Sequence, residues 1–251
     1  MNGVAWLSLN RPEVHNAMNE EMIAELTSLF SSYNKTTDIR AIVLTGNGSS
    51  FCAGADVNYM KSIASLGFNE NVEDGKKLAN LFKSVYDCPI PTIALVHGSA
   101  FGGANGLLAA CDIVIAEENT NFAFSEVKLG IAPATIAPFV IKRIGEFGAK
   151  ELMMTGKRFK APEAQKWNLV NHVYNSEKDE NPLNSILKQF ESSAPEAVKE
   201  TKILIKEVLG KDINKGIEFT SKLIAKLRAS EEGQDGMAAF LDKRKPFWNS
   251  K

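Results

Sequence analysis

Two glycine-bearing turns, each placed after an apolar, strand-like segment, constrain this sequence more than any other feature. The first turn covers residues 52–56, and the second covers residues 98–106 and opens a helix of small residues. One backbone N–H group from each turn can converge on a single negatively charged oxygen, and the helix N-terminus adds the positive end of its dipole. Such a donor lowers the barrier of a reaction through an oxyanion by about 2.7–4 kcal/mol. The turns therefore predict a site for an enolate or a related anion.

Strand and helix signals alternate along the first two thirds of the chain. Apolar strand-like runs fall at 4–9, 39–45, 92–97, 113–116 and 169–174. Helical spacing follows an expected N-cap at Asn19, with an apolar stripe of Met22, Leu26, Leu29 and Tyr33, and recurs at 72–86 and 102–111. Because the strands are apolar on both faces and the connections are short, the fold class is α/β with largely parallel strands.

The character of the chain changes beyond Pro138, where helical periodicity dominates, and only helices are readable from Pro182 onward. We place a boundary near residues 175–181. The expected division is a catalytic core at 1–175 and a helical region at 176–251. At 251 residues, the chain is long enough for one large domain or for a core with a helical appendage.

Composition excludes several classes of function. Lysine and arginine number 29 against 30 aspartates and glutamates, so the net charge of −1 offers no field that would collect nucleic acid. No apolar run approaches the roughly 20 residues that a membrane helix needs, and the N-terminus does not read as a secretory signal. The three cysteines (Cys52, Cys88 and Cys111) are expected to be buried, reduced thiols. These features predict a cytoplasmic protein with no nucleic-acid or membrane partner.

Glu126 is the strongest titratable candidate for catalysis. Apolar residues precede and follow it, and burial raises the pKa of a carboxyl group toward the range that suits a general acid or base. The alternative is a surface glutamate that pairs with Lys128, two positions away. Residue chemistry alone leaves these two interpretations about even.

Other catalytic patterns are not found in the sequence. His15, His97 and His172 fall in no metal-binding or triad spacing, so no metal site is predicted, and Asp112 is expected to make structural hydrogen bonds at a turn. The sequence has no Gly-x-Ser-x-Gly nucleophile elbow and no phosphate-binding loop, and residues 98–103 do not match the dinucleotide-binding glycine spacing.

Six stretches of the sequence, taken in order, resemble the crotonase (enoyl-CoA hydratase/isomerase) superfamily. The matching stretches lie at 9–12, 41–46, 51–56, 101–103, 110–113 and 124–130. The resemblance implies a spiral of ββα units with a C-terminal helical region that builds trimers, often paired into hexamers. It also implies an acyl-CoA thioester as substrate, with coenzyme A as part of the substrate and no further cofactor.

The same resemblance implies roles for individual residues. The backbone N–H groups of Ala55 and Gly103 would form the oxyanion hole, and Glu126 would be the catalytic carboxylate. The implied substrate-binding positions, of which the first six line the path of coenzyme A, are Glu13, Val14, His15, Ala53, Asp56, Val57, Gly102, Gly106 and Ala134.

The sequence departs from the family pattern at three places. Gly106 stands where hydratases of the family carry the first of two glutamates, and residues 133–138 replace a glycine-rich run. These departures resemble the branch that contains methylglutaconyl-CoA and carboxygeranoyl-CoA hydratases. Relatives also carry a strand ahead of Val4, so that edge is expected to be absent or the chain to begin late.

Three functions stay open on these observations. The first is a lyase that adds water reversibly to a 2-enoyl-CoA, with a branched substrate bearing a distal carboxylate as the expected type. The second is an isomerase that moves a double bond from the 3- to the 2-position, for which a single glutamate suffices. The third is a homologue that binds acyl-CoA without turnover.

Overall fold

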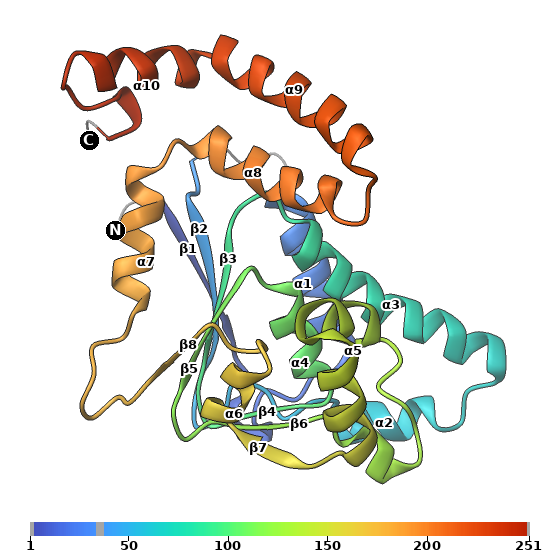
Figure 1. Cartoon of the computed structure of the whole chain (residues 1–251). Coiled ribbons are helices and arrows are strands. Elements are labelled where there is room, and N and C mark those ends of the chain that lie inside the picture. Colours follow the sequence, from blue (N-terminus) through green and yellow to red (C-terminus); the bar gives the residue numbers. More distant parts are fainter. Residues whose placement is uncertain (1–2, 34–37, 250–251) are drawn as a thin grey trace.

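A five-stranded parallel sheet forms the centre of the computed structural model, which describes residues 3–33 and 38–249 (Figure 1). Every neighbouring pair of strands in this sheet is parallel. In order across the sheet the strands are β1 (Val4–Leu9), β2 (Ala41–Gly46), β3 (Thr92–Val96), β5 (Ile113–Glu117) and β8 (His172–Tyr174). The predicted α/β class and all five predicted strands are confirmed, although β8 is shorter than expected.

A second sheet of three short strands lies below the first (Figure 1) and is not predicted by the sequence analysis. Its strands are β4 (Ser99–Phe101), β6 (Asn121–Ala123) and β7 (Arg158–Lys160). Runs of three residues are too short to show a strand period, which is why the sequence does not reveal them. The order β3, β4, α4 (Gly103–Ala110) recurs as β5, β6, α5 (Ala137–Thr155), which is the ββα repeat that the resemblance implies.

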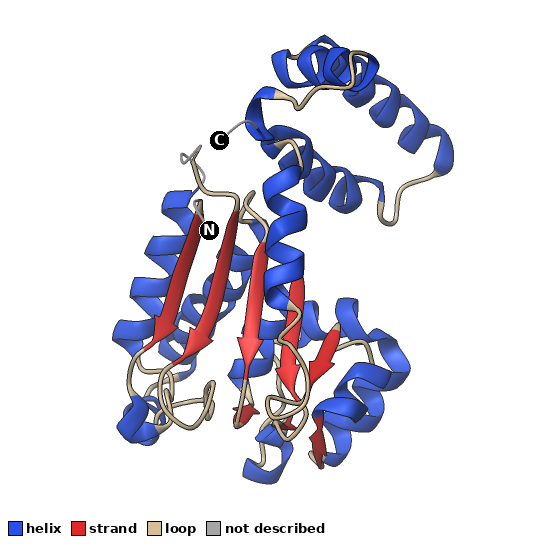
Figure 2. Ribbon diagram, turned by 90° about the vertical axis from the view of Figure 1, so that its left-hand side faces the viewer, coloured by secondary structure: helices blue, strands red, loops and turns tan. Residues whose placement is uncertain are grey.

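Helices cover both faces of the main sheet (Figure 2). On one face, the side chains of Ile42, Leu44 and Ala94 share a core with helices α1 (Glu20–Ser32), α3 (Phe68–Asp87), α4 and α5. On the other face, Val43 and Ile93 pack against α7 (Leu183–Ser192). Alternate residues of each strand therefore enter different cores, which explains why the strands read as continuous apolar runs.

Helix α1 begins where the sequence predicts, but its buried face is rotated. The Asn19 side chain caps the helix by accepting the N–H of Met22 at 3.0 Å. Ile23 and Phe30 are buried, whereas Leu29, which we expected in the apolar stripe, is 36 % exposed. The buried face is centred on Leu26 and Phe30, so Leu29 lies at its edge.

The C-terminal part of the chain is helical, as predicted from Pro182 onward. Helices α8 (Pro195–Val208), α9 (Ile213–Ala229) and α10 (Glu231–Leu241) follow α7 and lie beyond one end of the sheet (Figure 1). Lys202 of α8 pairs with Asp112 at 2.7 Å, and Asp112 also accepts the N–H of Thr92. Asp112 thus has the structural role expected for it, and the division of the chain at residue 175 stays a prediction.

The remaining helices are short. They are α2 (Val57–Ile63), α6 (Ala161–Lys166) and the 3₁₀ helices η1 (Pro12–Val14), η3 (Ser125–Leu129) and η4 (Phe247–Asn249). The three cysteines are buried and unpaired, as predicted. Among the described residues, no helix combines the length and the apolar character that crossing a bilayer requires.

Candidate active site

The two glycine turns lie side by side in the structure. The N–H of Cys52 donates to the carbonyl of Ser99 at 3.0 Å, and the N–H of Phe101 donates back to the carbonyl of Cys52 at 3.1 Å. Gly54 has a φ of +100°, and a Cβ atom at this position would lie 3.0 Å from the carbonyl oxygen of Phe101. Glycine is therefore required where the first turn touches the second.

Helix α4 begins within the second glycine turn, and the buried side chain of Asn105 holds the start of the helix in place. Gly102 precedes the helix with a φ of +51°, and Gly103 is its first residue. The side chain of Asn105 is fully buried, and its Nδ2 donates to the carbonyls of Ala100 at 3.3 Å and Ala123 at 2.9 Å. Because these carbonyls belong to β4 and β6, the N-terminus of α4 is held against the small sheet.

Two backbone donors remain open beside these turns. Within residues 3–33 and 38–249, neither the N–H of Ala55 nor that of Gly103 donates to another group of the protein. For Gly103 this follows from its place in the first turn of a helix, where N–H groups have no intrahelical acceptor. Both residues line one cavity of about 310 Å³. The arrangement matches the one the turns predict, and its catalytic role stays a prediction.

The carboxyl group of Glu126 lies at the same cavity, on η3. Its Oε1 atom would be 3.4 Å from a Cβ atom at Gly102, directly beside the start of α4. Its Oε2 atom is buried and accepts no hydrogen bond from any described residue. Burial raises the pKa of this carboxyl group, partly offset by a hydrogen bond from its own backbone.

The alternative interpretation of Glu126 as a surface residue paired with Lys128 finds no support. The described residues show no ion pair between these two side chains, and Lys128 is exposed while Oε2 of Glu126 is buried. The pKa of Glu126 is raised, as its apolar neighbours in the sequence predict. Glu126 thus has the environment of a general acid or base.

Gly106 lies behind the cavity wall, in the middle of α4. A Cβ atom at this position would be 2.5 Å from Cγ2 of Ile136 and 2.8 Å from Cζ of Phe82. Ile136 and Phe82 therefore occupy the space that the Cβ atom of any larger residue at position 106, a glutamate included, would need. The absence of that glutamate is built into the packing of the core.

The structure brings together six of the twelve predicted site residues. Those that line the cavity are Ala53, Ala55, Gly102, Gly103, Glu126 and Ala134. Those that do not line it are Glu13, Val14, His15, Asp56, Val57 and Gly106. A place for the first five of this second group on the path of coenzyme A stays a prediction.

Two residues that do not line the cavity, His15 and Asp56, make hydrogen bonds that hold the first glycine turn. The carbonyl of His15 accepts the N–H of Ala53 at 2.9 Å. Asp56 caps α2 by accepting the N–H of Asn58 at 2.8 Å, and its carboxylate pairs with Arg11 at 2.9 Å. The side chain of Asp56 therefore holds the backbone around Ala55, whatever else it contacts.

Sequence reasoning did not single out the polar residues on the α2–α3 side of the cavity. Tyr59 and Asp74 both line it, and the Tyr59 hydroxyl donates to Oδ1 of Asp74 at 2.6 Å. Neither residue belongs to a recognisable motif. The only local signal is Asp56 as a helix N-cap, which places Tyr59 in the first turn of α2.

Comparisons with known proteins show the family to which the chain belongs. The family model described as enoyl-CoA hydratase/isomerase matches residues 1–251. The short-chain-enoyl-CoA hydratase of Clostridium acetobutylicum is 34% identical over 248 residues, which cover 96% of this chain and 92% of that protein. The mevalonyl-coenzyme A hydratase of Aspergillus fumigatus is 34% identical over 98% of this chain and 91% of its own length.

Solved structures show the same relationship. The crystal structure of an enoyl-CoA hydratase from Shewanella pealeana superimposes with a TM-score of 0.93 at 37% identity, covering 98% of this chain and 92% of that one. Fold, matched length and identity all point the same way. The chain belongs to the enoyl-CoA hydratase/isomerase family, the crotonase superfamily, and is an enzyme of that family.

Proposed function

We propose that the protein adds water reversibly to the 2,3 double bond of a 2-enoyl-CoA thioester. The observation that carries this proposal is the meeting of three groups at one cavity: the open N–H groups of Ala55 and Gly103 and the buried carboxyl of Glu126. The thioester carbonyl oxygen would accept hydrogen bonds from both N–H groups. No cofactor or metal is needed for this reaction, because coenzyme A is part of the substrate.

Each group has a defined role in the proposed reaction. Glu126 accepts a proton from water while the water oxygen forms a bond to C3 of the substrate. The electron pair of the double bond moves toward the thioester, and the enolate oxygen is stabilised by the N–H groups of Ala55 and Gly103. Glu126 then gives the proton to C2, which yields the 3-hydroxyacyl-CoA and restores the carboxylate.

Isomerisation of a 3-enoyl-CoA is the second candidate, and the filled space at Gly106 favours it. Ile136 and Phe82 leave no room for a second carboxylate at this position. A single carboxylate suffices to remove a proton from C2 and return it to C4, whereas hydration must also orient a water molecule. The two reactions share Glu126 and the oxyanion donors.

A panel of thioesters distinguishes the candidates. We expect 3-hydroxyacyl-CoA to form from a 2-enoyl-CoA such as crotonyl-CoA, detected by mass spectrometry and by loss of the enoyl absorbance. Conversion of 3-enoyl-CoA to 2-enoyl-CoA without a hydroxylated product would assign the isomerase reaction instead. Tight binding without turnover of any member would identify a non-catalytic homologue.

The panel should include branched substrates. The resemblance to methylglutaconyl-CoA hydratases suggests 3-methylglutaconyl-CoA, and the Aspergillus fumigatus relative is named for a mevalonyl thioester. A role in leucine breakdown depends on turnover of the former compound. A location in the cytoplasm is part of the same proposal.

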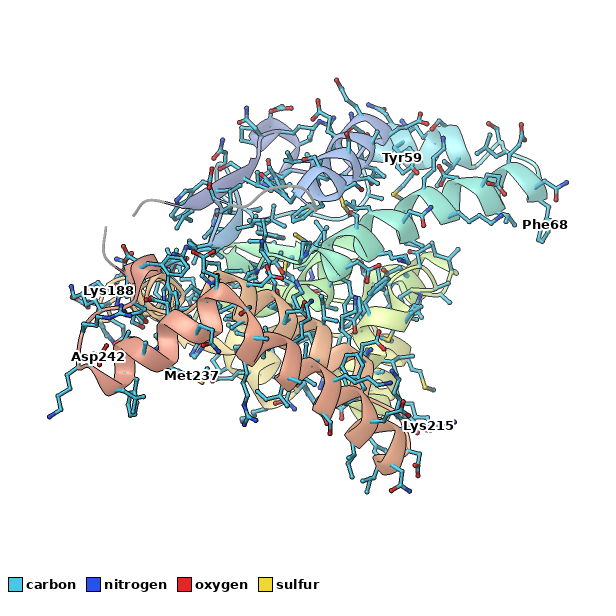
Figure 3. All side chains as sticks on the ribbon, turned by 90° about the horizontal axis from the view of Figure 1, so that it is seen from above. Tyr59, Phe68, Lys188, Lys215, Met237 and Asp242 are labelled. Carbon is cyan, nitrogen blue, oxygen red and sulfur yellow. The ribbon has the colours of Figure 1, made fainter. Side chains whose placement is uncertain are left out.

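We also propose that the chain assembles into a homotrimer or a hexamer through its C-terminal helices. Helices α8–α10 expose large apolar side chains, including Met237 (Figure 3). The most exposed are Ile205, Leu209, Ile213, Ile217, Phe240 and Leu241. Because an apolar surface of this kind marks an association site, light scattering should give a mass of three or six chains. A monomer at micromolar concentration would contradict this assembly.

A further inference from the structure

The side chains that line the active-site cavity include carboxylates but, among the described residues, no cation. Three ionisable side chains line it: Tyr59, Asp74 and Glu126. No lysine, arginine or histidine is among the described residues that line this cavity. The rest of the lining is apolar or neutral, so apart from the N–H donors of Ala55 and Gly103 a charged acyl group would meet carboxylates and no cationic side chain.

Tyr59 and Asp74 form one unit between α2 and α3. Tyr59, labelled in Figure 3, lies on α2, and its hydroxyl donates to Oδ1 of Asp74 on α3 at 2.6 Å. Burial raises the pKa of Tyr59, and the hydrogen bond to Asp74 and the charge of Asp74 raise it further. The tyrosine therefore keeps its proton, and the negative charge of the pair rests on Asp74.

An acidic surface lies on the other side of this pair. Tyr59 and Asp74 also line an outer hollow of about 550 Å³, together with Glu20, Glu70 and Glu73. Lys77 lies there as well, but it is paired with Glu20 at 2.7 Å. The charge of Lys77 also acts on Asp74, but Lys77 is not among the described residues that line the cavity.

A carboxylate at the end of an acyl group would be destabilised in this cavity. It would lose part of its hydration and lie near Asp74 and Glu126 without a cationic partner. A neutral acyl group of the same shape loses far less hydration and meets no repulsion. The difference in affinity between a carboxylate ligand and a neutral ligand of the same shape therefore measures the effect of the charge.

We propose that the Tyr59–Asp74 pair is a specificity determinant that selects uncharged acyl groups and rejects acyl groups ending in a carboxylate. The proposal rests on the proposed function, since it assumes that the acyl group of a thioester enters this cavity. It departs from the distal-carboxylate substrate that the sequence resemblance suggests. Hydroxylated, amidated and purely aliphatic acyl groups all belong to the accepted class.

Calorimetric binding of two matched ligands to the full-length protein tests this proposal. The ligands are glutaryl-CoA and the same compound with its terminal carboxylate replaced by a primary amide. We expect the amide to bind at least about tenfold more tightly, because like charges a few ångströms apart repel strongly at a partly buried site. In Asp74→Asn, which removes the charge and keeps the shape, the ratio should fall to about threefold or less.

Two control variants separate charge from structure. Tyr59→Phe removes the hydrogen bond to Asp74 but keeps the carboxylate, so it should retain the preference for the amide. Glu73→Gln removes an exposed charge from α3 outside the cavity and should leave both affinities unchanged. If the wild-type protein binds both ligands equally, or glutaryl-CoA more tightly, the proposal is wrong. An unchanged ratio in Asp74→Asn would likewise remove this residue as the determinant.

This measurement is independent of turnover. Failure to hydrate crotonyl-CoA would overturn the proposed function and leave the binding ratio interpretable. Hydration of crotonyl-CoA together with equal binding of the two ligands would overturn the selectivity proposal alone.

Discussion

Replacing Glu126 with glutamine is expected to lower kcat/KM for a 2-enoyl-CoA by about 10²–10⁴-fold. Glutamine keeps the size and shape of the side chain, so the cavity and the open N–H groups of Ala55 and Gly103 should be preserved. It cannot accept a proton from water or return one to C2. Steady-state hydration of crotonyl-CoA measures the loss, and calorimetry with butyryl-CoA should show that binding is retained.

Stability provides a control for the same variant. Because burial raises the pKa of Glu126, the folded state binds this proton more tightly than the unfolded state does. The contribution of Glu126 to stability is therefore complete below its ordinary pKa of about 4.3 and is lost as the pH rises through the raised value. Glu126→Gln should be at least as stable as the wild type at neutral pH in urea denaturation, and any advantage should disappear below about pH 4.

Lys128→Gln is the matched control for the surface interpretation of Glu126. Lys128 is exposed and makes no ion pair with Glu126, so this variant should retain nearly full activity. An equal loss of activity in Lys128→Gln and Glu126→Gln would favour a structural pair. Near-normal turnover in Glu126→Gln would exclude this residue from the mechanism.

Local sequence signals account for the groups that meet at the candidate active site. The glycines of the two turns are needed because Gly54 and Gly102 adopt positive φ and because the turns touch, so the requirement is visible in the sequence. The apolar neighbours of Glu126 in the sequence likewise predict that its carboxyl group is buried. The main sheet was predictable because each strand carries a continuous apolar run.

Features that depend on tertiary contact escaped prediction. Tyr59 and Asp74 are 15 residues apart on different helices, and only the tertiary fold brings them within hydrogen-bonding distance. The three strands of the small sheet carry too few residues for a pattern. The buried face of α1 differs from the expected stripe because packing against α3 and the shared core decides which side of the helix is covered.

Position 106, where the family pattern has the first of its two glutamates, shows this dependence most directly. The sequence reveals glycine at position 106, but it does not reveal that Phe82 and Ile136, from α3 and from the residue before α5, fill the vacated space. The sequence shows a change at one position, whereas the packing around it involves α3, α4 and the residue before α5. This packing decides whether a single substitution at position 106 could produce the two-carboxylate arrangement.

Gly106→Glu is therefore expected to destabilise the protein by about 3–5 kcal/mol and to bring no gain in hydration. Its Cβ alone would lie 2.5 Å from Ile136 and 2.8 Å from Phe82, so the core must shift before the carboxylate is placed. The carboxylate would then be buried without a cation. Urea denaturation gives the loss of stability, and crotonyl-CoA hydration gives the activity.

Two further variants separate crowding from charge in this prediction. Gly106→Ala adds only the Cβ atom and should cost about 1–3 kcal/mol through overpacking. Combining Gly106→Glu with Ile136→Ala removes the nearest obstructing atoms, so it should recover part of the stability and place the new carboxylate closer to the cavity. If Gly106→Glu alone were as stable as the wild type and hydrated crotonyl-CoA faster, the packing around Gly106 would not limit the chemistry. The number of catalytic carboxylates would then be set by the residue at position 106 alone and not by the packing around it.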